Sequence, residues 1–183
     1  MNNKMRQSFI EELNKKVNEY ADKHNLFNGG CCYSAYVLAS VLQKAGIKYR
    51  TVIFQYGDIL HETNFNNAIN GKCVSHVAIE VKYKGHMEII GRCTGIYSYF
   101  AHTGEQFKVR KYDGISPELL LEGYQNNNWN TMYNTKYNRP FTKAIQKIAN
   151  KYAEGGKVNL MKESGLSLNP FSFRDFMELV FGI

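Results

Sequence analysis

One stretch decides the fold of this 183-residue chain: GGCCYSAYVLASVLQKAGI, residues 29–47. Alanine, valine and leucine recur through it at helical spacing and widen its apolar face, which predicts a largely buried helix over 31–45. Two glycines precede the cysteine pair, and Gly46 stands where a left-handed residue ends a helix. We therefore expect a buried helix that begins at Cys31.

The residues on either side predict the elements around this helix. Ser8 with Glu11 three residues later forms a capping box, and apolar residues at helical spacing extend the helix that it opens to about Lys23. After Gly46 the pattern changes to alternating β-branched and aromatic residues, with a short turn at Lys84-Gly85. Strands are expected over residues 49–55, 73–83, 86–90, 96–100 and 106–111.

The last third of the chain is expected to be mostly helical. Ser116, Pro117 and Glu118 provide an N-cap, a first-turn proline and a first-turn acid. Helices are expected over residues 116–121, 140–153 and 170–181. Helices, then an antiparallel sheet, then helices make an α+β layout, and the length fits a single domain over 1–183.

The charge and the hydropathy pattern limit the function classes. A net charge of +7 and a pI near 9.1 favour acidic surfaces or polyanions, but the lysines are scattered and typical of a solvated surface. No basic block interleaved with aromatic residues marks a specific nucleic-acid site. No apolar run has the length of a signal peptide core or a membrane span, so we expect a soluble, cytoplasmic protein with no membrane partner.

The chain has four cysteines, which limit its redox chemistry: Cys31, Cys32, Cys73 and Cys93. Adjacent cysteines do not readily bridge each other, and the number is too small for a disulfide framework. The paired spacing of a zinc site is absent, and the histidines show no ligand spacing. We expect reduced thiols, one of them reactive, and neither a metal nor a cofactor.

Cys31 and His76 are the residues best placed for chemistry. The free amides and dipole at a helix start favour a thiolate, and Cys31 stands at such a start. A thiolate also needs a base, and His76 shares a strand face with the small Ala78. A helix packed on that face would bring sulfur and imidazole together, although a cysteine on a buried helix is more commonly a packed core residue.

Two motifs resemble the transglutaminase-like branch of the papain-like cysteine hydrolase superfamily. In that family the nucleophile cysteine is followed by alanine four residues on, by Gly-Ile at the helix end and by arginine opening a strand. Counted from Cys31, the residues in register are Ala35, Gly46, Ile47 and Arg50. The Gly-Gly-x-Cys entrance of arylamine acyltransferases is also similar, and it would favour Cys32 instead.

The second motif is His76-Val77-Ala78-Ile79-Glu80-Val81, which resembles the catalytic-histidine strand His-x-x-Val-Glu-Val of the same family. The resemblance covers about residues 25–94. It implies a papain-like or transglutaminase-like fold, with the nucleophile helix packed on an antiparallel sheet and extra helices at the C-terminus. The catalytic-type core would span about 9–112 and the helical extension about 113–183.

The resemblance also implies an orienting acid and an oxyanion hole. The family places an acid at the end of the returning strand, where this chain has Gly91. Thr94, Glu88 or an asparagine within 124–139 are the replacements considered, and spacing does not select among them. Asn25 or Asn28 would supply an oxyanion-hole amide beside the backbone amide of the nucleophile, or would stabilise the turn.

Two functions follow from these residues. The first is a cysteine hydrolase of the peptidase or amidase type, which attacks a peptide or amide-containing substrate and forms an acyl-thioester. Acyl transfer uses the same chemistry, but no acceptor site is marked. The alternative is a catalytically degenerate module that binds a protein partner in a phage or bacterial assembly. The missing acid favours this alternative. The Asn and Lys richness is typical of an AT-rich microbial or phage source.

Overall fold

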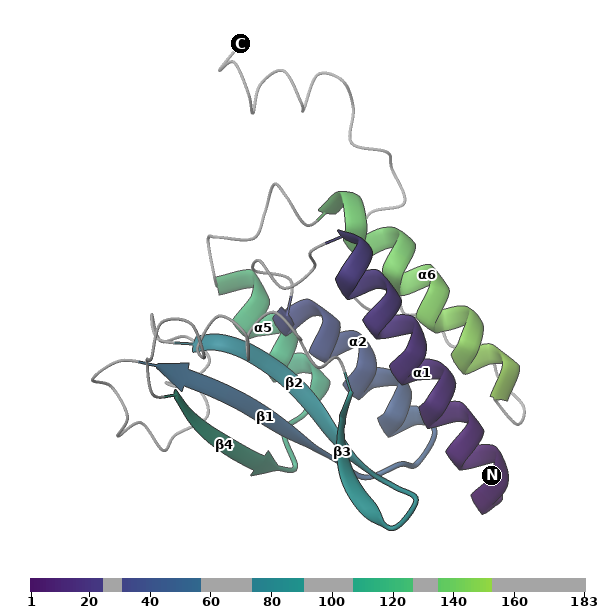
Figure 1. The fold of residues 1–183 in the computed structure, drawn as a ribbon. Helices are drawn as coiled ribbons and strands as arrows, with labels where there is room; N and C mark the ends of the chain where they lie inside the picture. Colours follow the sequence, from purple (N-terminus) through teal and green to yellow (C-terminus); the bar gives the residue numbers. More distant parts are fainter. Residues whose placement is uncertain (25–30, 57–73, 91–106, 127–134, 153–183) are drawn as a thin grey trace.

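The computed structural model describes residues 1–24, 31–56, 74–90, 107–126 and 135–152. These residues form an α+β unit of four helices and four strands (Figure 1). In chain order the elements are α1 (Asn3–His24), α2 (Cys31–Lys44), β1 (Tyr49–Tyr56), β2 (Val74–Tyr83), β3 (His86–Ile90), β4 (Phe107–Asp113), α5 (Pro117–Asn126) and α6 (Thr135–Tyr152).

The strands form one antiparallel sheet in the order β3-β2-β1-β4. The turn between β2 and β3 has positive φ at both central residues, 46° at Lys84 and 88° at Gly85, as the tight turns of hairpins require. The predicted strands at 49–55, 73–83, 86–90 and 106–111 are therefore confirmed within one or two residues. The strand expected at 96–100 lies outside the described residues.

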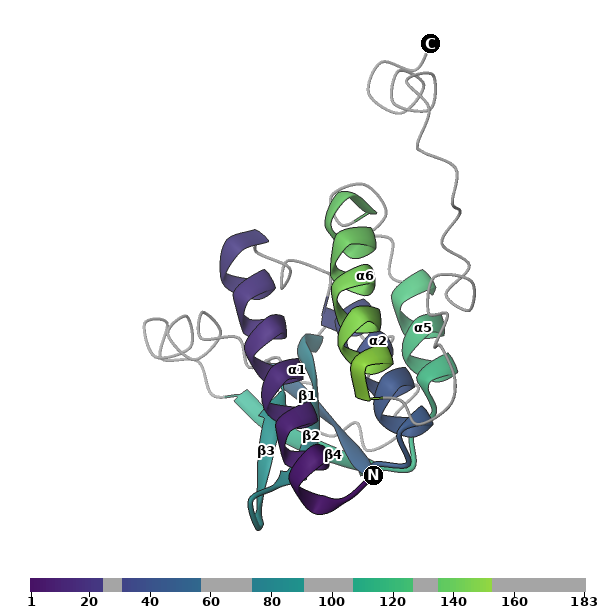
Figure 2. The same cartoon turned by 90° about the vertical axis from the view of Figure 1, so that its right-hand side faces the viewer.

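The helices cover one face of the sheet (Figures 1 and 2). Helix α2 packs on β1 and β2 and also contacts α5 and α6, while α1 contacts α6 and β3. The sheet residues of this core are Ile53, Val77, Ile79, Val81, Tyr83 and Ile90, all of them buried. Alternation along β2 sets the layers, because its more apolar face, that of Val77, Ile79 and Val81, lies against the helices.

Helix α2 is buried along most of its length, as predicted. Its C-terminus has a Schellman motif, in which the amide of Gly46 donates to Gln43 and the amide of Ile47 donates to Leu42, both at 2.9 Å. Gly46 has φ +67°, the left-handed conformation expected of it. Near the start of α2, the Tyr33 hydroxyl lies 2.7 Å from the hydroxyl of Thr142 in α6. A buried hydrogen bond thus joins the first turn of α2 to α6.

The capping box predicted at Ser8 and Glu11 is wrong. Helix α1 begins at Asn3, and the side chain of Asn2 caps it by accepting a hydrogen bond of 2.9 Å from the amide of Met5. Ser8 therefore lies inside the helix. The apolar stripe that packs on the core is confirmed, but the polar residues before it, which readily form helix, add more than one further turn.

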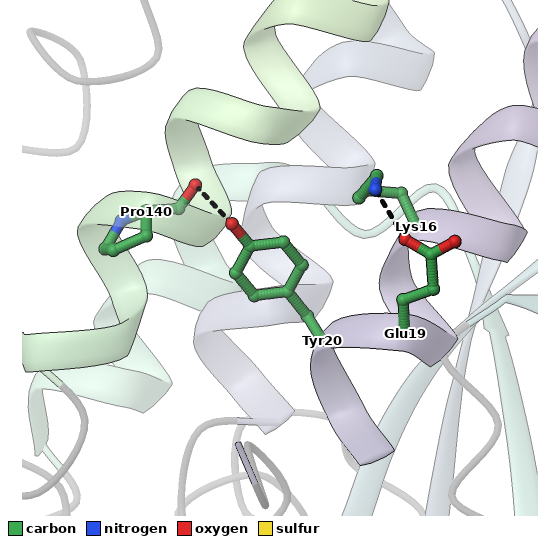
Figure 3. Close-up of polar contacts among 4 residues, drawn as sticks. All are labelled: Lys16, Glu19, Tyr20 and Pro140. Carbon is green, nitrogen blue, oxygen red and sulfur yellow. Dashed lines mark hydrogen bonds and ion pairs between the residues drawn. The ribbon is translucent and has the colours of Figure 1, made fainter. Parts of the chain in front are cut away.

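The C-terminal helices are longer than predicted. Helix α5 continues to Asn126, and α6 begins at Thr135, so that Pro140 lies inside it instead of at its start. The carbonyl of Pro140 accepts a hydrogen bond of 3.3 Å from the Tyr20 hydroxyl of α1 (Figure 3). Figure 3 also shows the Lys16–Glu19 ion pair on α1. The helix expected at 170–181 lies outside the described residues.

None of the helices that the structure describes is both long and apolar enough to cross a bilayer.

We predict that Gly46→Ala lowers the free energy of unfolding by about 1 kcal/mol, because a Cβ disfavours left-handed backbone. No atom lies within 4 Å of the position that the Cβ would take, so the cost is conformational and not steric. Chemical denaturation would measure it. Gly46→Asn is the matched control and should cost less, since asparagine tolerates this conformation. Equal costs for the two variants would contradict the assignment.

Candidate cysteine–histidine site

Cys31 is the first residue of α2, and its side chain is buried. The first amides of a helix have no partner inside the helix, and its dipole places partial positive charge there. No acidic residue lies in the first turn of α2 to oppose this field. The position therefore favours the charged form of the Cys31 thiol.

His76 lies near the start of β2, directly after an irregularity in the sheet. Phe54 of β1 lies opposite His76, whereas the next residue of β1, Gln55, lies opposite Val74, so β2 carries one extra residue at this point. Such β-bulges occur next to active sites, where they redirect a side chain. The His76 ring is buried, with its centroid 5.6 Å from that of Phe54 and the planes 46° apart.

The expectation that the helix packs on the His76 face of the strand is wrong. Helix α2 covers the opposite face, that of Val77, while Val52, Phe54 and Ala78 form a second apolar cluster on the His76 side. The reason is hydrophobic, because the face of Val77 and Ile79 is the more apolar one. Sulfur and imidazole nevertheless meet, since Cys31 lies at the helix end that reaches the bulged start of β2.

The Cys31 sulfur makes three hydrogen bonds at this point. Its partners are the side chain of Cys32, the side chain of His76 and the backbone amide of Val77. The Cys32 hydrogen bond, the His76 contact and its charge, and the Val77 amide together lower the pKa of the Cys31 thiol well below its ordinary value, against the opposing effect of burial. A thiolate is thus favoured at Cys31.

Cys32 has the opposite tendency. Its hydrogen bond to Cys31 and its burial raise the pKa of the Cys32 thiol well above its ordinary value. Two adjacent buried thiols do not both ionise easily, so one holds the negative charge while the other keeps its proton and donates a hydrogen bond to it. The imidazole and the Val77 amide act on Cys31, which favours Cys31 as the thiolate of the pair.

Glu88 does not orient the imidazole. The register of the hairpin places it opposite Val81, five residues along β2 from His76, which is about 17 Å at roughly 3.4 Å per residue. Its carboxylate accepts a hydrogen bond of 3.0 Å from the Asn14 amide of α1 instead. Gly91, Thr94, the asparagine side chains within 124–139, and the oxyanion-hole candidates Asn25 and Asn28 lie outside the described residues.

An ion-pair cluster around the buried carboxylate of Glu80 lies on the same sheet face as His76. The carboxylate of Glu80 lies 2.7 Å from Arg50 on β1 and 2.7 Å from Lys111 on β4. Arg50 of the cysteine motif and Glu80 of the histidine motif lie opposite each other on β1 and β2, so these two charged residues are partners. The sequence reasoning did not predict this pairing, although a glutamate between valine and isoleucine in a buried strand signals a compensating cation.

Metal-binding geometry is absent from the described residues. No group of three or more histidine, cysteine, aspartate or glutamate side chains within them lies close enough to hold a metal ion. Cys73 and Cys93 lie outside this part of the chain.

No protein-family model, no curated protein and no solved structure matches the chain. The chemistry of the site therefore rests on the geometry around Cys31.

We predict that Cys32→Ala raises the pH midpoint of Cys31 alkylation, because it removes the hydrogen-bond donor that stabilises the thiolate. Cys32→Ser is the matched control: it keeps a donor of similar size and should leave the midpoint close to that of the native protein. The measurement is the pH-rate profile of iodoacetamide labelling, mapped to Cys31 by mass spectrometry. A midpoint unchanged in Cys32→Ala would show that this hydrogen bond does not hold the thiolate.

Proposed function

We propose that the chain is a cysteine hydrolase of the peptidase or amidase type, built on a papain-like, transglutaminase-like core. The observation that carries the proposal is the contact of the Cys31 sulfur with both the His76 side chain and the Val77 amide. The order of elements supports it, with a nucleophile helix followed by antiparallel strands, the second of which holds the histidine.

In the proposed reaction the Cys31 thiolate attacks the carbonyl carbon of an amide and forms a tetrahedral oxyanion. The protonated His76 gives its proton to the leaving nitrogen, the carbon–nitrogen bond breaks, and an acyl-thioester remains on Cys31. The neutral His76 then takes a proton from water as the water attacks the thioester. Release of the carboxylic acid restores the thiolate and the imidazolium.

The proposed roles follow from the surroundings of each group. The amides of the first turn of α2 lie beside the nucleophile and are the natural donors to an oxyanion. Cys32 keeps its proton and stabilises the charged Cys31 by donating a hydrogen bond to it. Phe54 packs on the His76 ring and limits its orientations. In the family that the motifs resemble, an acid orients the imidazole.

A second function has one specific observation in its favour. Cys31 is 8% exposed and His76 is 2% exposed, so neither offers much surface to a substrate. With Gly91 at the position of the acid, this enclosure suits a degenerate papain-like module that serves as a structural or protein-interaction component of a phage or bacterial assembly. Its partner would be a protein and not a peptide substrate.

We place the protein in the reducing cytoplasm. Cys31 and Cys32 are both free thiols, and thiolate chemistry at Cys31 requires them to stay reduced. An oxidised sulfur at Cys31 would have no nucleophilic function.

The test is acylation by p-nitrophenyl acetate, an activated ester that needs no substrate recognition. We expect a burst of nitrophenol release and an acetyl group on Cys31, located by peptide mass spectrometry. His76→Gln should slow the acyl-enzyme turnover by about 10²- to 10⁴-fold, the usual contribution of a general acid–base.

Two controls decide between the functions. Cys31→Ala should abolish the burst, whereas Cys32→Ser should retain it, and circular dichroism would verify that each variant is folded. Acetylation spread over lysines, with no dependence on Cys31 or His76, would overturn the hydrolase proposal and leave the interaction module.

A further inference from the structure

A cavity of about 310 Å³ lies between the first turns of α1 and the turn that joins β2 to β3. Figures 1 and 2 both show the N-terminal end of α1 beside this hairpin. Its described lining residues are Asn3, Arg6, Gln7, Ile10, Lys82, Lys84 and Gly85. The four from α1 are spaced as one helix face, so two rigid elements form the walls.

The charge of the cavity has one sign. Arg6, Lys82 and Lys84 line it, and none of the lining residues that the structure describes is acidic. Neither Arg6 nor Lys82 forms an ion pair with a carboxylate in the described part of the chain. Three cations around one cavity repel each other, and an anion bound between them would offset this repulsion.

Lys84 differs from the other two cations. Its ammonium lies 4.9 Å from the centre of the Tyr83 ring, and its pKa is raised by the contact with Tyr83 and by the nearby Glu11 and Glu88. These two carboxylates already offset part of its charge. The attraction for an anion therefore comes mainly from Arg6 and Lys82, with Lys84 as a third contributor.

The remaining lining residues indicate the kind of anion. Asn3 and Gln7 carry side-chain amides that donate hydrogen bonds, and buried Ile10 offers a small apolar wall. The first-turn amide of Met5 does not serve as a donor to the anion, because it is already hydrogen-bonded to the Asn2 side chain. Guanidinium and ammonium groups with amide donors match phosphate oxygens, and the apolar wall suits a short organic substituent.

We propose that this cavity binds a small phosphate monoester. A concave site of this volume fits a small molecule better than the extended contact of a nucleic acid or an acidic protein surface. It is separate from the cysteine–histidine site, because Lys82 lies six residues along β2 from His76, or about 20 Å at roughly 3.4 Å per residue.

The test is an NMR titration with inorganic phosphate and with glycerol 3-phosphate, at constant ionic strength set with sodium chloride. We expect saturable shifts of the backbone amides of Arg6, Gln7 and Gly85, with tighter binding of the monoester. The double variant Arg6→Gln, Lys82→Gln should weaken binding about tenfold or more. Lys15→Gln with Lys23→Gln removes the same charge from exposed positions outside the cavity and should leave binding unchanged.

Shifts that do not saturate, or that spread evenly over the basic surface, would overturn the proposal, as would equal weakening in both double variants. Binding to acidic peptides or anionic vesicles without binding of either phosphate would also overturn it and assign the cavity to a macromolecular surface. The amide spectrum of each variant verifies its fold. Because the test does not involve Cys31, its failure would leave the proposed hydrolase function untouched.

Discussion

The burial of α2 is the constraint on which the rest of the described structure depends. Eleven of its residues are buried, so the sheet, α5 and α6 all pack against it. Each Å² of apolar surface that these side chains remove from water stabilises the fold by about 25 cal/mol. Because the helix is fixed at this depth, its first residue, Cys31, is held at the start of β2 with little freedom to move away from His76.

The site combines two effects of that burial. Removal from water disfavours a charge on any thiol, yet the hydrogen bonds from Cys32, His76 and Val77 reverse the effect at Cys31. At Cys32 the hydrogen bond to Cys31 and the burial both raise the pKa of the thiol, so Cys32 stays protonated. A low-dielectric site strengthens each of these hydrogen bonds, so the enclosure that restricts access also defines which sulfur is charged.

The sequence predicted most of the described elements, and the contact that we expected between Cys31 and His76 is present. The predictions failed where tertiary contacts decide. The helix over 31–44 and the hairpin at Lys84-Gly85 follow from local patterns, namely apolar periodicity and turn chemistry. Helix α1 begins at Asn3 because Asn2 caps it, although Ser8 has an equally suitable capping side chain. The face of β2 that meets α2 was misjudged, although the more apolar character of the Val77 and Ile79 face is visible in the sequence. The extra residue of β2 beside His76 arises from the register with β1 and leaves no local signal. The Arg50–Glu80 pair likewise becomes visible only once two strands are aligned.

An ultraviolet titration of thiolate absorbance would show whether Cys31 is a thiolate held by His76. The difference between the native protein and Cys31→Ser isolates this sulfur. We expect a transition well below the ordinary cysteine pKa of about 8.5, and we expect it to move upward in His76→Gln. A transition at or above that value, unaffected by His76→Gln, would make Cys31 an ordinary buried thiol and remove the basis of the proposed hydrolase.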